Sequence, residues 1–243
     1  MRAAALAFAA AAAIISGCQP GQGIRGYWSS RTISLEDVTA AEDQFADFAL
    51  LAAGAPQQEA FAAVDMLLKK AAEDEVAFYV YSEWIIRGFS TLDSPCRSCP
   101  IFVHAADKIL GKGILNDFEA EEYSRRREFC LHNQAGQKAE LPEVVGSASL
   151  PSGSRTLFLV IDQDCPACKE AMQKFRSTKW VGTTRIALCY GRGQLPEEEG
   201  WLCCRISPQQ DILDVRQAPF FFVISPSGTV ELSYTSVNQE IAL

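Results

Sequence analysis

The chain has 243 residues, of which 48% are hydrophobic. This length and composition support a substantial buried core and exclude a disordered or fibrous protein. The 22 basic and 30 acidic side chains give a net charge of −8, which argues against nucleic acid as a partner, because nucleic-acid binding needs concentrated Lys and Arg. The nine cysteines are many for a cytosolic enzyme and indicate thiol chemistry, an oxidising compartment or a metal site.

The N-terminus has the pattern of an export signal. A short basic start, Met1-Arg2, precedes an apolar run over residues 3–15, which is too short to span a bilayer but suits a signal-peptide core. The following segment, Ile15-Ser16-Gly17-Cys18, resembles the lipobox of bacterial lipoproteins. The resemblance implies that residues 1–17 are a signal peptide and that Cys18 is lipidated, with an ordinary signal peptide or an Ala-rich buried helix as alternatives. Gln19 resembles the residue found in lipoproteins passed to the outer membrane. We therefore expect a membrane-anchored lipoprotein, periplasmic or in the outer membrane, whose body is soluble.

The first half of the mature chain has a helical pattern. Residues 18–33 are rich in Gly, Gln and Pro and are predicted to be a flexible tether. Residues 34–133 are predicted to form an all-α domain, with a helix start near Ser34. Apolar residues at three- and four-residue spacing predict helices around 60–71 and 76–85. Further helices are predicted from Ile101 to Leu110 and from Asn116 to Leu131.

From residue 137 to residue 243 the pattern changes to short apolar runs that alternate with turns. Residues 156–161 lack a polar face, as a strand buried on both sides does. A helix over 165–175 and a second buried strand over 184–190 follow, which predicts a parallel βαβ unit. Two further apolar runs, 219–224 and 229–234, flank a Pro-Ser-Gly turn and predict a hairpin. The fold class is therefore α/β, a mixed sheet flanked by helices, preceded by the all-α domain.

The candidate chemistry lies in Cys165-Pro166-Ala167-Cys168, between the first buried strand and its helix. Two thiols at this spacing can close a small disulfide ring, and the helix dipole favours Cys165 as the thiolate. Pro166 suits the first helical position, where its missing N–H has no helical partner. A Cys-x-x-Cys pair also occurs in zinc sites and structural disulfides, so its place in a βαβ unit is what makes it informative.

At this motif the sequence resembles the thioredoxin superfamily, and Gln217-Ala218-Pro219-Phe220-Phe221 strengthens the match. The resemblance implies a thioredoxin-like domain in which a cis-proline, Pro219, begins a strand and faces the disulfide. It also implies that the backbone of Ala218 presents itself to an extended substrate, as an added strand does.

The resemblance narrows to thioredoxin-like bacterial lipoproteins that carry a helical N-terminal domain, a group without a settled physiological role. The residues that carry it include Leu92-Asp93-Ser94-Pro95, Asn133-x-x-Gly136-x-x-Ala139, and Cys189-Tyr190 followed by Trp201. The TlpA/ResA-type thiol–disulfide oxidoreductases are broader relatives.

Two positions depart from thioredoxin itself. Asp164 stands where thioredoxin has Trp, and its negative charge disfavours a neighbouring thiolate. Leu159 stands where thioredoxin places a buried acid that helps proton transfer. Both departures argue against efficient thioredoxin-like turnover.

The other cysteines are open to several interpretations. For Cys96-Arg97-Ser98-Cys99 we favour a local structural disulfide between Cys96 and Cys99; a zinc site completed by His104 and His132, or a redox partner for the first motif, are the alternatives. The two motifs are too far apart in sequence for a four-cysteine zinc ribbon. Cys130 and Cys189 fit buried small hydrophobes. One of the adjacent Cys203 and Cys204 could pair with Cys189 or Cys130, and the sequence does not choose.

These patterns favour a lipid-anchored extracytoplasmic thiol–disulfide oxidoreductase in which Cys165 attacks, Cys168 resolves and Pro219 presents its neighbouring backbone. The expected partners are extracytoplasmic thiol or disulfide proteins, with the membrane reached through the lipid only. No cofactor and no resident metal are expected. The alternative is a non-catalytic thioredoxin-like binding module or scaffold lipoprotein, since fold alone does not fix function. A zinc-dependent scaffold is a third interpretation.

Overall fold

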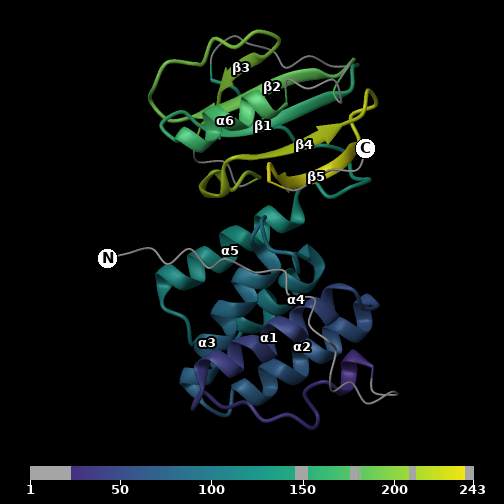
Figure 1. Cartoon of the computed structure of the whole chain (residues 1–243), viewed down its shortest axis with the longest axis vertical. Coiled ribbons are helices and arrows are strands. Elements are labelled where there is room, and N and C mark those ends of the chain that lie inside the picture. The colour runs from purple at the N-terminus through teal and green to yellow at the C-terminus, as the bar shows by residue number, and fades with distance from the viewer. Residues whose placement is uncertain (1–22, 146–152, 176–179, 181, 208–211, 239–243) are drawn as a thin grey trace.

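The computed structural model describes residues 23–145, 153–175, 180, 182–207 and 212–238. The helices of the N-terminal region come first along the chain and a five-stranded sheet follows, so the long axis of the molecule runs from helices to sheet (Figure 1). Cys18 and residues 1–17 lie outside the described residues. Within the described part of the chain, each helix is too short or too polar to cross a membrane.

The helical region is built from helices with clear start signals. Asp37 caps α1 (Val38–Ala53) by accepting a hydrogen bond from the Ala40 N–H, and Asp74 caps α3 in the same way. Asn116 and Glu119 form a reciprocal capping box at the start of α5. The remaining bounds are α2 Gln57–Ala71, α3 Glu75–Ile85, the π-helix η2 Ile86–Ser90, α4 Cys99–Leu110 and α5 Asp117–Leu131.

The structure corrects two expectations in this region. The first helix begins at Val38 rather than near Ser34, because Asp37 is the residue whose side chain caps it. Part of the expected tether is a 3₁₀ turn, η1 (Ile24–Gly26), followed by the fully buried Trp28. The Trp28 ring packs edge-on against Phe48 and Tyr81. Burying the indole ring stabilises the fold by more than the conformational entropy lost when this Gly-rich segment is ordered. This explains why the segment is held against the helices.

The sheet has the strand order β3-β2-β1-β4-β5. Strand β1 (Thr156–Asp162) pairs in parallel with β2 (Thr184–Tyr190), and helix α6 (Pro166–Lys174) connects them, which confirms the βαβ unit. Strand β4 (Phe220–Ile224) runs antiparallel to both β1 and β5 (Val230–Ser236) and forms the expected hairpin. The sequence did not predict β3 (Leu202–Arg205), a four-residue edge strand parallel to β2.

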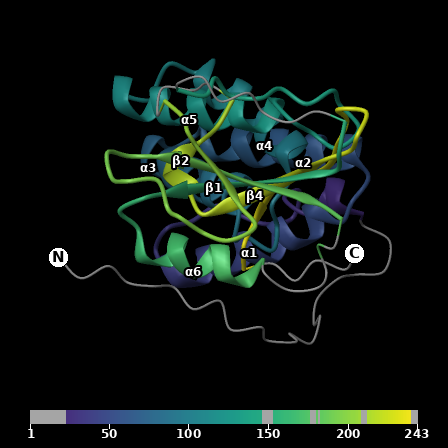
Figure 2. The ribbon, with the colours of Figure 1, turned by 90° about the horizontal axis from the view of Figure 1, so that it is seen from above.

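Both faces of the sheet are buried, and α6 covers only one of them. Alternate side chains along β1, such as Leu157 and Leu159, pack with Cys168 and Met172 of α6. The intervening residues, including Phe158 and Val160, face the opposite side, where they join a cluster that contains Leu92 and Phe129 of the helical region. In Figure 2 the strands lie between α6 and α5. This double burial explains why residues 156–161 have no polar side.

The end of α5 seals the second face. The Phe129 ring stacks on Tyr234 of β5 with centroids 4.4 Å apart and meets Phe220 of β4 edge-on. The buried Asn133 follows with a φ of 51°, a left-handed conformation that Asn tolerates. Its amide nitrogen donates to the Tyr234 hydroxyl (2.5 Å) and to the Glu140 carbonyl (2.8 Å). Aromatic stacking and this amide therefore join the helices to the sheet.

We expect Phe129→Ala to lower the free energy of unfolding by about 3–5 kcal/mol, because the substitution leaves a cavity between α5 and the sheet. Phe118→Ala is the matched control: Phe118 lies on the same helix but is 73% exposed, and its loss is expected to change stability by less than about 0.5 kcal/mol. Urea unfolding followed by circular dichroism measures both. Equal losses for the two variants would contradict the role of Phe129.

Candidate active site

The dithiol lies where β1 ends and α6 begins. Cys165 is the N-cap of α6 and Pro166 is its first residue, as the sequence predicts. The Cys165 N–H donates to the Asp162 carbonyl and the Cys168 N–H donates to the Cys165 carbonyl, each at 3.2 Å. This tight turn leaves Cys165 half-buried and places Cys168 one turn inside, fully buried. One sulfur is thus accessible and the other is protected.

The two cysteine side chains are in hydrogen-bond contact, and the environment distinguishes them. Burial is the largest of the effects that raise the pKa of Cys168 to about 12, and the neighbouring Cys165 and the Asp162 carboxylate act in the same direction. The backbone N–H of Asp162 donates to the Cys168 sulfur at 3.3 Å and partly offsets these effects. Cys168 is therefore protonated at neutral pH and is a poor nucleophile until a base removes its proton. This property suits the second of two thiols to react.

Asp162 and Tyr190 form a polar pair beside the dithiol. Tyr190 is one of the residues that carry the family resemblance, but the sequence predicted a role in the site for neither residue. One Asp162 oxygen accepts from the Asp164 N–H (2.9 Å) and the other accepts from the Tyr190 hydroxyl (3.2 Å). Burial and the Asp162 charge both raise the pKa of Tyr190, so its phenol remains a donor. The clue to this pair is its place in the sheet: Asp162 and Tyr190 are the last residues of the parallel strands β1 and β2 and lie opposite each other in the register. The site thus has a carboxylate, although Leu159 replaces the buried acid.

Arg205 of β3 holds the loops around this pair. Its guanidinium donates to the Gln163 side chain at 3.3 Å, to the Gly193 carbonyl at 2.6 Å and to the Gly191 carbonyl. Gly191 has a φ of +105°, and an added Cβ would lie 3.6 Å from the Asp162 and Asp164 carboxylates. A side chain here would be strained, so glycine is required where the loop turns past the acids.

Ala218 and Pro219 immediately precede the neighbouring strand β4, at the end of the sheet where β1 ends. The register pairs Val160 with Phe220, so the two residues before Phe220 run alongside the last residues of β1. The Ala218–Pro219 bond is cis, as expected. Ala218 is extended (φ −63°, ψ 145°) and half-buried, and like Cys165 it packs against the hydrophobic cluster that contains Cys168. Cys165 and Ala218 therefore pack against the same cluster as Cys168, with Pro166 and Ala167 in the first turn of α6 and Pro219 next to Ala218 in the chain.

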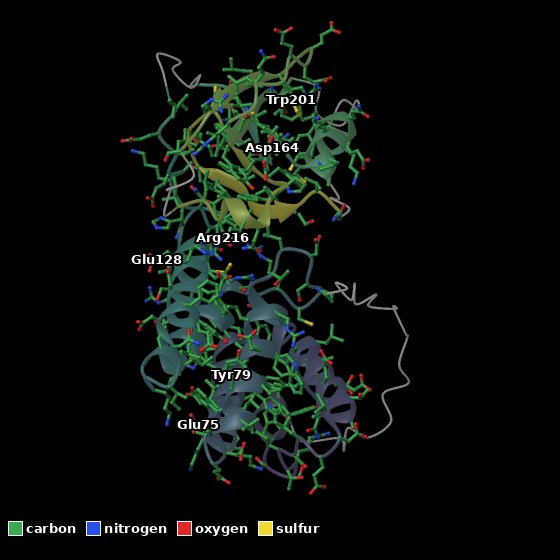
Figure 3. All side chains as sticks on the ribbon, turned by 90° about the vertical axis from the view of Figure 1, so that its left-hand side faces the viewer. Glu75, Tyr79, Glu128, Asp164, Trp201 and Arg216 are labelled. Atoms are coloured by element: carbon green, nitrogen blue, oxygen red, sulfur yellow. The ribbon has the colours of Figure 1, made fainter. Side chains whose placement is uncertain are left out.

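The segment before Pro219 is fastened to the helical region. This segment contains the 3₁₀ turn η4 (Val215–Gln217) and Asp214, the residue before it. Arg216 forms an ion pair with Glu122 of α5 at 3.2 Å, and the buried Asp214 forms one with Arg125 of the same helix. The Gln217 side chain accepts from the Leu92 N–H at 3.2 Å. Figure 3 shows Arg216 at the boundary between helices and sheet, and Asp164 farther into the sheet region. Helix α5 therefore helps to position the chain that enters the site.

The remaining described cysteines lie away from the dithiol or deeper in the core, and each is a free thiol. The structure does not contain the expected Cys96–Cys99 disulfide: the Cys99 thiol is hydrogen-bonded to Cys130, whereas the Cys96 thiol contacts Ser94. Cys203 contacts Cys189, one of the two partners considered for it.

The histidines of the alternative zinc site have other partners. His104 stacks on Phe61 and contacts Asp65 at 2.8 Å, and His132 lies 3.1 Å from Glu140. Among the described residues, no group of three or more His, Cys, Asp or Glu side chains is arranged to hold a metal ion.

Comparison with known proteins shows the fold. No model of a known protein family matches the chain, and no curated protein matches it in sequence. Among solved structures, it is similar to a thioredoxin-like protein from Bacteroides caccae, with a TM-score of 0.69 and 15% sequence identity. The match covers 88% of this chain and 87% of the other, so it includes helical residues as well as the sheet. The chain therefore has a thioredoxin-like fold.

We expect a small alkylating agent to label Cys165 before Cys168 in the reduced protein. With a pKa of about 12, Cys168 is a thiolate in roughly one molecule in ten thousand at pH 8. Its labelling should rise about tenfold per pH unit between pH 8 and pH 10, because only the thiolate reacts. Iodoacetamide labelling with fragment mass spectra locates the modified sulfur. Preferential labelling of Cys168 at neutral pH would contradict the assignment.

Proposed function

We propose that the chain is a lipid-anchored extracytoplasmic thiol–disulfide oxidoreductase that uses Cys165 and Cys168. The observation that carries the proposal is the pairing of an accessible Cys165 with a buried, protonated Cys168, beside the extended Ala218 backbone. A structural disulfide needs no such asymmetry, whereas two-step exchange needs one thiol to react first and the other to wait.

The exchange follows from these positions. The Cys165 thiolate attacks one sulfur of a substrate disulfide, which forms a mixed disulfide and releases the first substrate sulfur as a thiolate. Cys168 then loses its proton and attacks the Cys165 sulfur, forming the Cys165–Cys168 disulfide and releasing the second substrate sulfur. The substrate disulfide gains two electrons from the protein dithiol, and the proton that Cys168 loses leaves one of the two released substrate sulfurs as a thiol. The reverse sequence oxidises a substrate dithiol.

The Asp162 carboxylate supports the second step. It acts electrostatically on Cys168 and accepts a hydrogen bond from Tyr190, so it is a base available to the proton that Cys168 loses. The substrate is an extracytoplasmic protein thiol or disulfide. Its extended backbone can lie along Ala218, which is half-buried and itself extended.

We expect Cys165→Ser to reduce exchange with oxidised glutathione and with insulin disulfides to background, because the first nucleophile is removed. Cys168→Ser should accumulate a mixed disulfide, with one glutathione attached at Cys165, since nothing resolves it. Cys204→Ser is the control, because Cys204 is buried on the opposite face of the sheet and should leave exchange unchanged.

The same experiment separates the alternative of a non-catalytic binding module. If wild-type Cys165 and Cys168 keep one redox state across a series of glutathione buffers, and Cys168→Ser accumulates no adduct, the dithiol is inert. A binding role for the fold would then be the better explanation.

The membrane anchor is a separate part of the proposal and rests on the Ile15-Ser16-Gly17-Cys18 segment. We expect the protein to fractionate with membranes and the Cys18→Ala variant to appear in the soluble fraction, because a multiply acylated cysteine binds firmly and its loss removes the anchor. Cys204→Ala is the control for replacing a cysteine elsewhere. A Cys18→Ala protein that stays with membranes after a high-salt wash would show another anchor.

A further inference from the structure

A second pair of thiols lies at one end of the α4–α5 hairpin. Cys99 is the first residue of α4, and Cys130 is the last but one of α5. A short connection, residues 111–116, joins the two helices, so they run antiparallel and the start of α4 meets the end of α5. Figure 1 shows the two helices beside each other below the sheet. The hairpin thus brings together Cys99 and Cys130, which are 31 positions apart in the sequence.

The contacts at this point hold the two sulfurs together. The thiols of Cys99 and Cys130 are hydrogen-bonded to each other in the core of the helical region. The Gln134 side chain contacts the Cys99 sulfur and also donates to the Cys130 carbonyl at 2.7 Å. The Arg97 guanidinium lies 3.6 Å from the Cys99 sulfur. Cys96, the sequence neighbour, lines a separate cavity of about 330 Å³ with Phe45 and Trp84 among its walls.

The electrostatics give the two sulfurs different roles. The hydrogen bond from Cys130 lowers the pKa of Cys99, and the Arg97 charge and Gln134 act in the same direction, against the effect of burial. The same contact and burial raise the pKa of Cys130. A thiolate at a helix start beside a protonated thiol is the arrangement in which one sulfur attacks and the other resolves.

We propose that Cys99 and Cys130 form a second, internal dithiol–disulfide couple that fastens the start of α4 to the end of α5. The oxidant is a small disulfide such as oxidised glutathione, because Cys99 is 7% exposed and Cys130 is 2% exposed, too little for a protein substrate. The Cys99 thiolate attacks one sulfur of the small disulfide and releases a thiolate. Cys130 loses its proton and attacks the Cys99 sulfur, which releases the second small thiol. Two electrons pass from the protein to the oxidant.

A Cys99–Cys130 disulfide would lie next to the residues through which α5 contacts the sheet. Cys130 adjoins Phe129, which seals the second sheet face, and α5 carries Glu122 and Arg125, which hold the segment before Pro219. A disulfide at the end of α5 therefore stabilises the helix that holds the segment before Pro219. The inference does not depend on exchange at Cys165 and Cys168.

Trypsin places the three relevant cysteines in three different peptides, so a cross-linked peptide pair identifies which two cysteines are joined. Cleavage after Arg87, Arg97, Lys108, Arg127 and Lys138 places Cys96 in 88–97, Cys99 in 98–108 and Cys130 in 128–138. The full-length protein is equilibrated in glutathione buffers of rising oxidised fraction, blocked with N-ethylmaleimide and digested without reduction. We expect peptides 98–108 and 128–138 to be recovered cross-linked in the oxidising buffers. A cross-link between 88–97 and 98–108, or full blocking of Cys99 and Cys130 in every buffer, would overturn the proposal.

Matched variants test the same point with a second readout. Cys130→Ser should abolish the cross-link, and Cys96→Ser should retain it. The oxidised wild type should melt several degrees above the reduced form, and Cys130→Ser should lose this difference. The cross-link should also form in the Cys165→Ser, Cys168→Ser double variant, so failure of the proposed oxidoreductase would leave this result intact. Loss of the cross-link in Cys96→Ser but not in Cys130→Ser would contradict the pairing.

Discussion

A sheet with apolar side chains on both faces must be covered twice, and here the second cover is the end of helix α5. Helix α6 protects one face, and the stacking of Phe129 on Tyr234 closes the other. Exposing that face would return Phe158, Phe220 and Phe222 to water, at about 25 cal/mol for each Å² of apolar surface. The helical region is therefore part of the sheet's core, which agrees with a structural match that extends over most of the chain.

This shared core has a consequence for the thiol site. The Asp214 side chain is only 1% exposed, and a buried carboxylate is tolerated because Arg125 of α5 pairs with it. Arg216 and Gln217 add polar contacts to Glu122 and Leu92. The chain that leads to Ala218 and Pro219 is thus positioned from outside the sheet. The helices help to set the geometry beside Cys165, in addition to covering the sheet.

The sequence predicted the parts of this arrangement that depend on local pattern. The unbroken apolar run of β1 and the 3.6-residue period of α2 each require burial, so their existence could be inferred. The edge strand β3 is four residues long and has no clear alternation, so it was missed. Trp28 lies in a Gly-rich stretch whose composition favours a tether, and its ring is held by tertiary packing against Phe48 and Tyr81. The pairing of Asp162 with Tyr190 likewise depends on register between strands that are distant in sequence.

The two Cys-x-x-Cys motifs show why spacing alone does not fix a thiol's partner. In the first motif, Cys165 is the N-cap and Cys168 is the third residue of α6, so one helical turn brings both sulfurs to the same side. In the second motif the helix begins only at Cys99, and Cys96 precedes it in a turn held by Ser94. No helical turn joins that pair, and the sulfur that meets Cys99 comes instead from the neighbouring helix. The position of the helix start relative to the motif, rather than the motif itself, decides which sulfurs come into contact.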